Sequence, residues 1–195
     1  MFPEWILSIL LEWLAQMVSG GLLKKYFYST RWLFLIAILI VSLDQISKVL
    51  IRQNLAFGEI WSPWEWLTPY ARFIHINNTG AAFGMFKNGN PIFMVLAVIV
   101  SGAILYYYPR VPENEKVIRF SLSLQLAGAV GNLIDRIFFG HVTDFISVGN
   151  FAIFNIADSS ITVGVTILLI AVWLQDRKEK KANFEKDTQE PAEEA

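Results

Sequence analysis

The stretch WLFLIAILIVSLDQISKVL, from Trp32 to Leu50, is almost wholly apolar until Asp44 and Lys48 near its far end. A helix needs about 20 mainly apolar residues to cross the hydrocarbon core of a bilayer. This stretch therefore predicts a membrane-spanning helix. Three further stretches meet the same criterion: Pro91–Tyr108, Val117–Phe139 and Ile156–Leu174. We expect an all-α membrane protein with four transmembrane helices.

The composition favours the same class. Of the 195 residues, 54% are hydrophobic, and the mean hydropathy of +0.44 is high for a soluble protein. The formal net charge of −1 gives no field that would attract nucleic acid, so we expect no nucleic-acid partner. The absence of cysteine excludes disulfides, thiolate nucleophiles and cysteine-based zinc sites. We expect no metal, no organic cofactor and a monomer in the bilayer.

The distribution of Lys and Arg predicts the orientation of the spans, because cytoplasmic loops carry an excess of positive charge. One side of the membrane would hold ten such residues: Lys24, Lys25, Arg31, Arg110, Lys116, Arg119, Arg177, Lys178, Lys180 and Lys181. The other side would hold four: Arg52, Arg72, Lys87 and Arg136. Both termini are therefore predicted in the cytoplasm, and the acidic ends of the spans are predicted at the outer face.

The segments outside the spans divide the chain into three parts. Residues 1–29 are mostly apolar before Lys24 and Lys25, with Glu4 and Glu12 as the only charges there, which favours an N-terminal interfacial helix over a fifth spanning helix. Residues 30–176 form the four-helix membrane domain, in which residues 51–90 are expected to be a small β cradle on the outer surface. That expectation rests on the alternation of Arg72–Asn77 and on the turn signal after it. The charged residues 177–195 predict a disordered cytoplasmic tail.

Asp144 and Asp158 are the strongest functional candidates. A carboxylate at the edge of a bilayer is costly to ionise and usually has a functional role. Two neighbouring carboxylates share one proton, because both cannot ionise cheaply, and such a pair can activate water. Their positions differ by 14, and a compact loop at Gly149-Asn150 would bring them together. The alternatives are an ordinary loop acid at Asp144 and a carboxylate at Asp158 that favours a helix N-terminus.

Polar residues of the third span and of the start of the fourth lie near this pair. Asn132 and Arg136 are four residues apart and share a helical face, where they could bind substrate or tune a carboxyl pKa. Asp135 points elsewhere, and we expect it to pair with a neighbouring helix. Asn155 precedes Asp158 by three residues and is a further substrate-binding candidate. The alternative is a purely structural polar interface.

Two other motifs contribute to the same region. In Asn78–Gly84 an amide side chain precedes a small, flexible backbone, which would let an extended substrate approach, although an ordinary turn explains the pattern equally well. Asp44 and Lys48 are four residues apart and are expected to form an ion pair that supports the site. His141 is expected to be a bystander.

Two functional hypotheses arise from these acids. The first is an enzyme in which Asp144 and Asp158 activate water. The second is a small proton-coupled transporter, because intramembrane acids also relay protons. Transporter sites lie near the bilayer midplane between internal repeats. Here the acids gather at one face and no repeat is visible, so the enzyme is favoured.

Five motifs in order resemble those of the bacterial lipoprotein signal peptidase family, also called signal peptidase II: Asp44–Lys48, Asn78–Phe83, Gly131–Arg136, Val142–Phe145 and Phe154–Asp158. The resemblance implies an aspartic endopeptidase of the bacterial cytoplasmic (inner) membrane. It implies that Asp144 and Asp158 are catalytic. The substrate-binding positions would be Asn78, Asn132, Arg136 and Asn155, and the supporting positions Asp44, Lys48 and Asp135. The implied substrate is a prolipoprotein with a diacylglyceryl-modified cysteine, cleaved just before that cysteine, and the implied inhibitor is the antibiotic globomycin.

Overall fold

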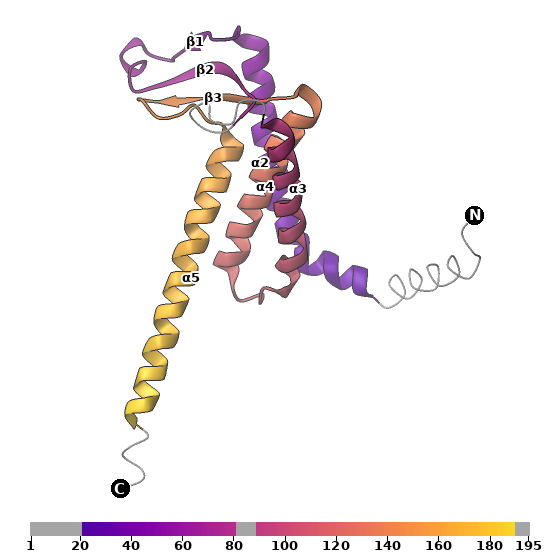
Figure 1. The fold of residues 1–195 in the computed structure, drawn as a ribbon, viewed down its shortest axis with the longest axis vertical. Coiled ribbons are helices and arrows are strands. Elements are labelled where there is room, and N and C mark those ends of the chain that lie inside the picture. The colour runs from indigo at the N-terminus through magenta and orange to yellow at the C-terminus, as the bar shows by residue number, and fades with distance from the viewer. Residues whose placement is uncertain (1–20, 81–88, 190–195) are drawn as a thin grey trace, which may run out of the picture.

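The computed structural model describes residues 21–80 and 89–189. A small sheet lies across one end of four long helices, one of which diverges from the other three with distance from the sheet (Figure 1). The helices are α2 (Leu22–Asn54), α3 (Asn90–Tyr107), α4 (Lys116–Phe139) and α5 (Ile156–Gln189). The strands are β1 (Ile60–Trp61), β2 (Ala71–Asn78) and β3 (Val142–Val148), and the short 3-10 helices are η1 (Glu65–Leu67) and η3 (Tyr108–Arg110).

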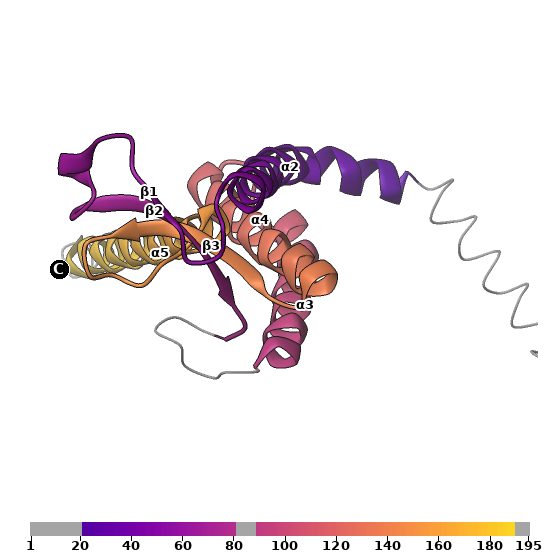
Figure 2. The same ribbon diagram turned by 90° about the horizontal axis from the view of Figure 1, so that it is seen from above.

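All four helices are long and apolar enough to cross a membrane, which confirms the expected fold class. In α2, α3 and α5 no more than 17% of the most apolar window is buried, whereas in α4 the share is 56%. The outer helices thus present large apolar side chains outward, where lipid would surround them. Seen from above, α4 lies among α2, α3 and α5 (Figure 2). The helix with the least apolar membrane-spanning window is the central one.

Small residues let α4 occupy this central position. Gly128 lies so close to α5 that an added Cβ would be 2.3 Å from the backbone oxygen of Ala157. Close backbone approach at small residues is the usual way in which membrane helices pack. The apolar core that joins α2, α3 and α4 includes Leu33, Ala37, Ile104, Tyr108, Leu126 and Ala127.

The sheet is antiparallel, in the order β1-β2-β3. β2 was expected from the alternation at residues 72–77. β3 was not predicted, because the residues after the third span were interpreted as a loop. In the register of β2 and β3, Asn78 faces Val142 and Ile76 faces Asp144. The sheet therefore brings the end of β2 next to the first residues of β3, directly above the bundle (Figure 1).

Both ends of the described chain differ from the sequence-based boundaries. α5 continues to Gln189, so residues 177–189 are helical rather than disordered, and residues 190–195 lie outside the described part. Lys and Glu are good helix formers, and Lys180 and Asp176 form an ion pair of 2.7 Å one turn apart. α2 begins at Leu22, so residues 22–29 continue the first span. The interfacial helix expected in the remainder of 1–29 lies outside the described residues.

Candidate active site

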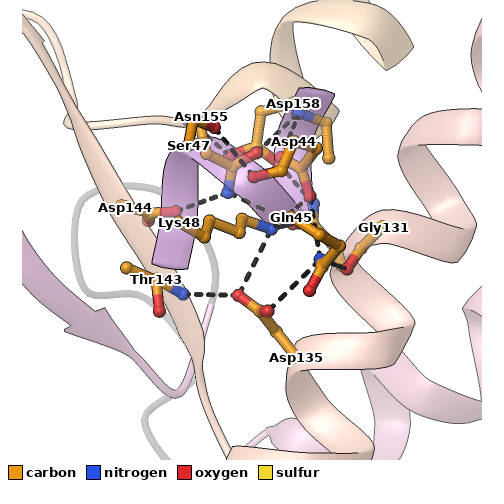
Figure 3. Close-up of polar contacts among 12 residues, drawn as sticks. Asp44, Gln45, Ser47, Lys48, Gly131, Asp135, Thr143, Asp144, Asn155 and Asp158 are labelled. Carbon is orange, nitrogen blue, oxygen red and sulfur yellow. Dashed lines mark hydrogen bonds and ion pairs between the residues drawn. The ribbon is translucent and has the colours of Figure 1, made fainter. Parts of the chain in front are cut away.

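A cluster of polar residues lies at the end of the bundle that the sheet covers, and Figure 3 shows its contacts. They come from α2, α4, α5 and the two longer strands, so five segments distant in sequence meet there. The buried polar side chains of this cluster include Asp44, Lys48, Asn132, Asp135, Thr143, Asp144 and Asn155. Buried polar groups on this scale are expensive unless each has a partner.

A tight reversal of the chain brings the start of α5 beside β3. Gly149 has a φ of +51°, a left-handed conformation that suits glycine. Phe154 then pairs with Ile146, with two backbone hydrogen bonds of 2.8 and 3.0 Å. The chain thereby folds back at Gly149-Asn150, as the sequence predicts, and Asp144 and Asp158 belong to neighbouring segments.

Asn155 caps the first turn of α5. Its side-chain oxygen accepts a hydrogen bond from the backbone N–H of Asp158 at 2.9 Å. The Asp158 carboxylate reaches back toward the backbone N–H of Asn155 at 3.4 Å. This reciprocal arrangement is a capping box, here built from Asn and Asp. It holds Asp158 at the helix N-terminus, where the dipole favours a negative charge.

Amide side chains hold both carboxylates of the pair Asp144 and Asp158. Asp144 accepts hydrogen bonds from the side-chain amides of Asn78 at 2.8 Å and Asn155 at 2.7 Å, one on each oxygen. Asp158 accepts one from the side-chain amide of Asn132 at 2.7 Å. Three of the four residues expected to bind substrate therefore contact this carboxylate pair directly.

The electrostatic environment of Asp144 is unusual for a carboxylic acid. Burial, together with the nearby charge of Asp158, raises the pKa of Asp144 from 3.8 to about 7. The hydrogen bonds from Asn78 and Asn155 and the charge of Lys48 oppose this rise. At neutral pH Asp144 is therefore close to half protonated, which suits a group that must both give and take a proton.

A buried ion cluster underlies the pair. The Lys48 ammonium lies 2.8 Å from Asp44 and 3.2 Å from Asp135, and it donates a hydrogen bond to the side-chain oxygen of Asn132 at 3.1 Å. Asp44 also accepts the backbone N–H of Ala157 at 2.9 Å. The expected pairing of Asp44 with Lys48 is confirmed, and so is the contact of Asp135 with a neighbouring helix. Lys48 thus links α2 to α4 next to the carboxylate pair (Figure 3).

Arg136 lies beside this cluster rather than within it. Its guanidinium is 5.3 Å from the centre of the Phe93 ring and donates a long hydrogen bond of 3.4 Å to the backbone oxygen of Asn132. Its Nε is buried and has no hydrogen-bond partner among residues 21–80 and 89–189. The guanidinium therefore retains donors that an acceptor from outside could use.

Three contributors to the site were missed in the sequence. Gln45 bridges Asp44 and the backbone oxygen of Gly131, with both distances 3.1 Å. Arg52 donates to the Thr143 hydroxyl at 2.8 Å, and the Thr143 backbone N–H donates to Asp135 at 2.9 Å. Arg52 follows Lys48 by one helical turn, and that spacing was the available signal. No pattern in the sequence indicated a role for Gln45 or Thr143.

Two other expectations concern the edge of the site. The ring of His141 lies 6.3 Å from that of Phe139, centre to centre, a contact outside the carboxylate pair. In the motif Asn78–Gly84, the side-chain oxygen of Asn78 accepts the backbone N–H of Gly80 at 2.9 Å, which closes the predicted turn. Residues 81–84 lie outside the described residues.

Comparisons with known proteins agree on one family. The family described as Signal peptidase (SPase) II matches residues 36–174. The lipoprotein signal peptidase of Moorella thermoacetica is 41% identical over 137 residues, 69% of this chain and 87% of that protein. That of Staphylococcus carnosus is 36% identical over 164 residues, 80% of this chain and 98% of that protein. A solved structure of a bacterial membrane enzyme matches with a TM-score of 0.70 at 33% identity, covering 76% of this chain and 90% of that one.

Proposed function

Because the chain belongs to the signal peptidase II family, we propose that Asp144 and Asp158 hydrolyse the signal peptide bond of a lipoprotein precursor as an aspartic acid/base pair. The family makes the chain a multi-pass bacterial membrane peptidase that removes signal peptides from lipoproteins. The observation that carries the proposal is the position of the pair, held by three asparagine amides at one end of the bundle.

The proposed reaction is a general acid/base hydrolysis. One carboxylate is ionised and takes a proton from water while the water oxygen attacks the scissile carbonyl carbon. The other is protonated and polarises the carbonyl oxygen. Collapse of the tetrahedral intermediate breaks the C–N bond, and the nitrogen leaves with a proton from the pair. The products are a carboxylic acid and an amine, and the pair regains its single proton.

The raised pKa of Asp144 supports this division of labour. With a pKa of about 7, the Asp144 carboxyl can hold the shared proton through much of the neutral range. The two groups interact, so the observed titration belongs to the pair and not to either residue. The hydrogen bonds from Asn78 and Asn155 keep Asp144 oriented in either protonation state.

The remaining polar groups would hold the substrate. The guanidinium of Arg136, whose N–H groups are not all bonded to described residues, suits peptide carbonyl oxygens close to the pair. Asn78 stands at the end of β2, where an extended peptide can approach the side chain of Asp144. The diacylglyceryl group of the precursor would lie along the apolar outer faces of the helices. Such placement of the lipid would explain why the hydrolytic site lies at the edge of the bilayer. Cleavage would fall just before the lipidated cysteine.

We also propose the orientation that the basic residues favour. Both termini would lie in the cytoplasm, and the sheet with the carboxylate pair would lie at the outer face. The competing hypothesis of a proton-coupled transporter is less favoured, because the family acts as a peptidase.

The test is an assay of the purified full chain in detergent with a prolipoprotein carrying diacylglyceryl on its cysteine. The proposal expects one cleavage, just before that cysteine, and inhibition by globomycin. The same precursor without the lipid should be cleaved poorly, because its apolar anchor is missing. Cleavage elsewhere in the precursor, or none with the lipid-modified form, would contradict the proposal.

A further inference from the structure

A cavity of about 510 Å³ lies between α2, η3 and α4 at the end of the bundle opposite the sheet. It is far from the carboxylate pair, so peptide hydrolysis does not account for it. Figure 1 shows that the first turns of α2 lean away from the bundle at this end. Hydroxyl groups of Ser29 and Thr30 donate to the backbone oxygen of Tyr26 here, a type of bond that often bends helices.

Arg119 fixes a positive charge in the wall of this cavity. Its guanidinium donates to the backbone oxygen of Val111 at 2.8 Å and to that of Ser29, and it lies 4.3 Å from the centre of the Tyr108 ring. The side chain is buried, so solvent screens its charge only weakly. The contacts hold the guanidinium in place whether or not a ligand is present.

Two further cations line the cavity without a carboxylate partner. Among the Asp and Glu side chains that the structure describes, none forms an ion pair with Arg31 or Lys116 within 4.0 Å. The guanidinium carbon of Arg31 lies 4.1 Å from the centre of the Tyr28 ring, a cation–π contact that occupies none of its N–H donors with a carboxylate. Glu113 is the acidic group of the lining, so three cations face one anion.

Part of the remaining lining is apolar and exposed on the outside of the bundle. Trp32 and Phe120 belong to the cavity and are also among the exposed apolar side chains of the molecule. Both stand near the ends of spanning helices, at the depth where lipid headgroups meet acyl chains. The cavity therefore offers positive charge beside an apolar surface on which hydrocarbon can lie.

We propose that this cavity binds the phosphate of an anionic phospholipid. Arg31 and Lys116 would donate hydrogen bonds to the phosphate oxygens, and Arg119 would stabilise the negative charge from beneath. The acyl chains would run along Trp32 and Phe120 toward the middle of the bilayer. Basic pockets between spanning helices are a recurring form of anionic lipid site.

A neighbouring groove provides an internal comparison. It has a volume of about 660 Å³ and lies between η3, the start of α4 and α5. Its charged lining residues are Arg110, Lys178, Glu115 and Glu179, so cations and anions balance. Glu115 there already accepts a hydrogen bond from Gln175 at 2.6 Å. The neighbouring groove is larger, so volume does not identify the cavity beside α2 as an anion site. Its excess of positive charge does.

The test uses the purified full chain in detergent micelles with phosphatidylglycerol or phosphatidylcholine of the same acyl chains. Native mass spectrometry then counts the lipid molecules that remain bound. Phosphatidylglycerol should bind preferentially, because the choline cation of the other lipid is repelled by the net positive lining. Arg31→Gln and Lys116→Gln should each lower this preference roughly fivefold.

The matched controls are Arg110→Gln and Lys178→Gln, which remove the same charge from the neighbouring groove and should leave the preference unchanged. Lys116 stands at the start of α4, where loss of a positive charge does not weaken the helix, so the Lys116 variant should fold. Inorganic phosphate at millimolar concentration should not displace the lipid. Equal retention of both lipids, displacement by inorganic phosphate, or an equal effect of the control variants would overturn the proposal.

Discussion

The side-chain amide of Asn155 donates a hydrogen bond of 2.7 Å to the carboxylate of Asp144, a residue 11 positions earlier. The same side chain caps α5, because its oxygen accepts a hydrogen bond of 2.9 Å from the backbone N–H of Asp158 in the first turn of that helix. One asparagine thus contacts both members of the carboxylate pair. The position of Asp144 relative to Asp158 therefore depends on the residue that caps α5.

Asn155→Ala should therefore damage both stability and catalysis. The change leaves the buried Asp144 carboxylate without one donor and α5 without its cap, which should lower the free energy of unfolding by about 1–3 kcal/mol. Small displacements of reacting groups are costly, so kcat/KM for the lipid-modified precursor should fall roughly 100-fold. Asn114→Ala, the same change in an exposed loop, is the control. Unchanged activity of the Asn155 variant would show that the cap does not position the acids.

The pH profile should report the Asp144 carboxyl group. Its pKa is raised to about 7, so the pair keeps its proton below that pH and loses it above. We expect kcat/KM to fall as the pH rises through about 7. The hydrogen bond from Asn78 favours the ionised form and lowers this pKa. Asn78→Ala should therefore move the alkaline fall to higher pH.

The control for that profile is Asn54→Ala, which removes an exposed amide whose bond is to the backbone oxygen of Leu50. This variant should show the same dependence of kcat/KM on pH as the unmodified protein. A profile of the Asn78 variant that is unmoved, or that moves to lower pH, would contradict the role given to this hydrogen bond.

Lys48→Met should destabilise the protein strongly. It removes the cation that lies 2.8 Å from Asp44 and 3.2 Å from Asp135, and unpaired buried carboxylates cost about 3–5 kcal/mol. The melting temperature in detergent should fall accordingly, and adding Asp44→Asn should restore part of the loss. The matched control is Lys180→Met, which breaks an ion pair of the same helical spacing and 2.7 Å length on the surface. Exposed pairs contribute at most about 1 kcal/mol, so equal losses in the two variants would contradict this account.

Gly128→Ala should separate α4 from α5. The added Cβ would meet the backbone oxygen of Ala157 at 2.3 Å, and Ala157 directly precedes Asp158. Overpacking of this kind costs about 1–3 kcal/mol, and the displaced helix should lower the cleavage rate as well. Gly102→Ala is the control, because its Cβ would meet nothing within 4 Å, and it should be neutral or stabilising in the same melting and cleavage measurements. If the Gly128 variant had the same melting temperature and the same cleavage rate as the Gly102 variant, the close contact between α4 and α5 would be contradicted.

The apolar stretches and the acids at their ends were readable in the sequence, because burial in lipid demands long apolar runs and makes each charge conspicuous. β3 was not readable, since Val142–Val148 takes its structure from pairing with β2, more than 60 residues earlier. Gln45 and Thr143 were missed for a related reason: only the tertiary contacts give them partners. The end of α5 was misjudged because charge marks the end of a membrane span but not the end of a helix.

The most direct test measures the initial rate at which Asp144→Asn and Asp158→Asn cleave the lipid-modified precursor, with Asp176→Asn, an exposed residue of α5, as the control. All three proteins should insert and fold, as judged by their melting temperatures. The account predicts that each of the first two variants loses activity by roughly 10²–10⁴-fold, the usual contribution of a general acid or base, while the control keeps it. Undiminished cleavage by either Asp144→Asn or Asp158→Asn would contradict the central claim.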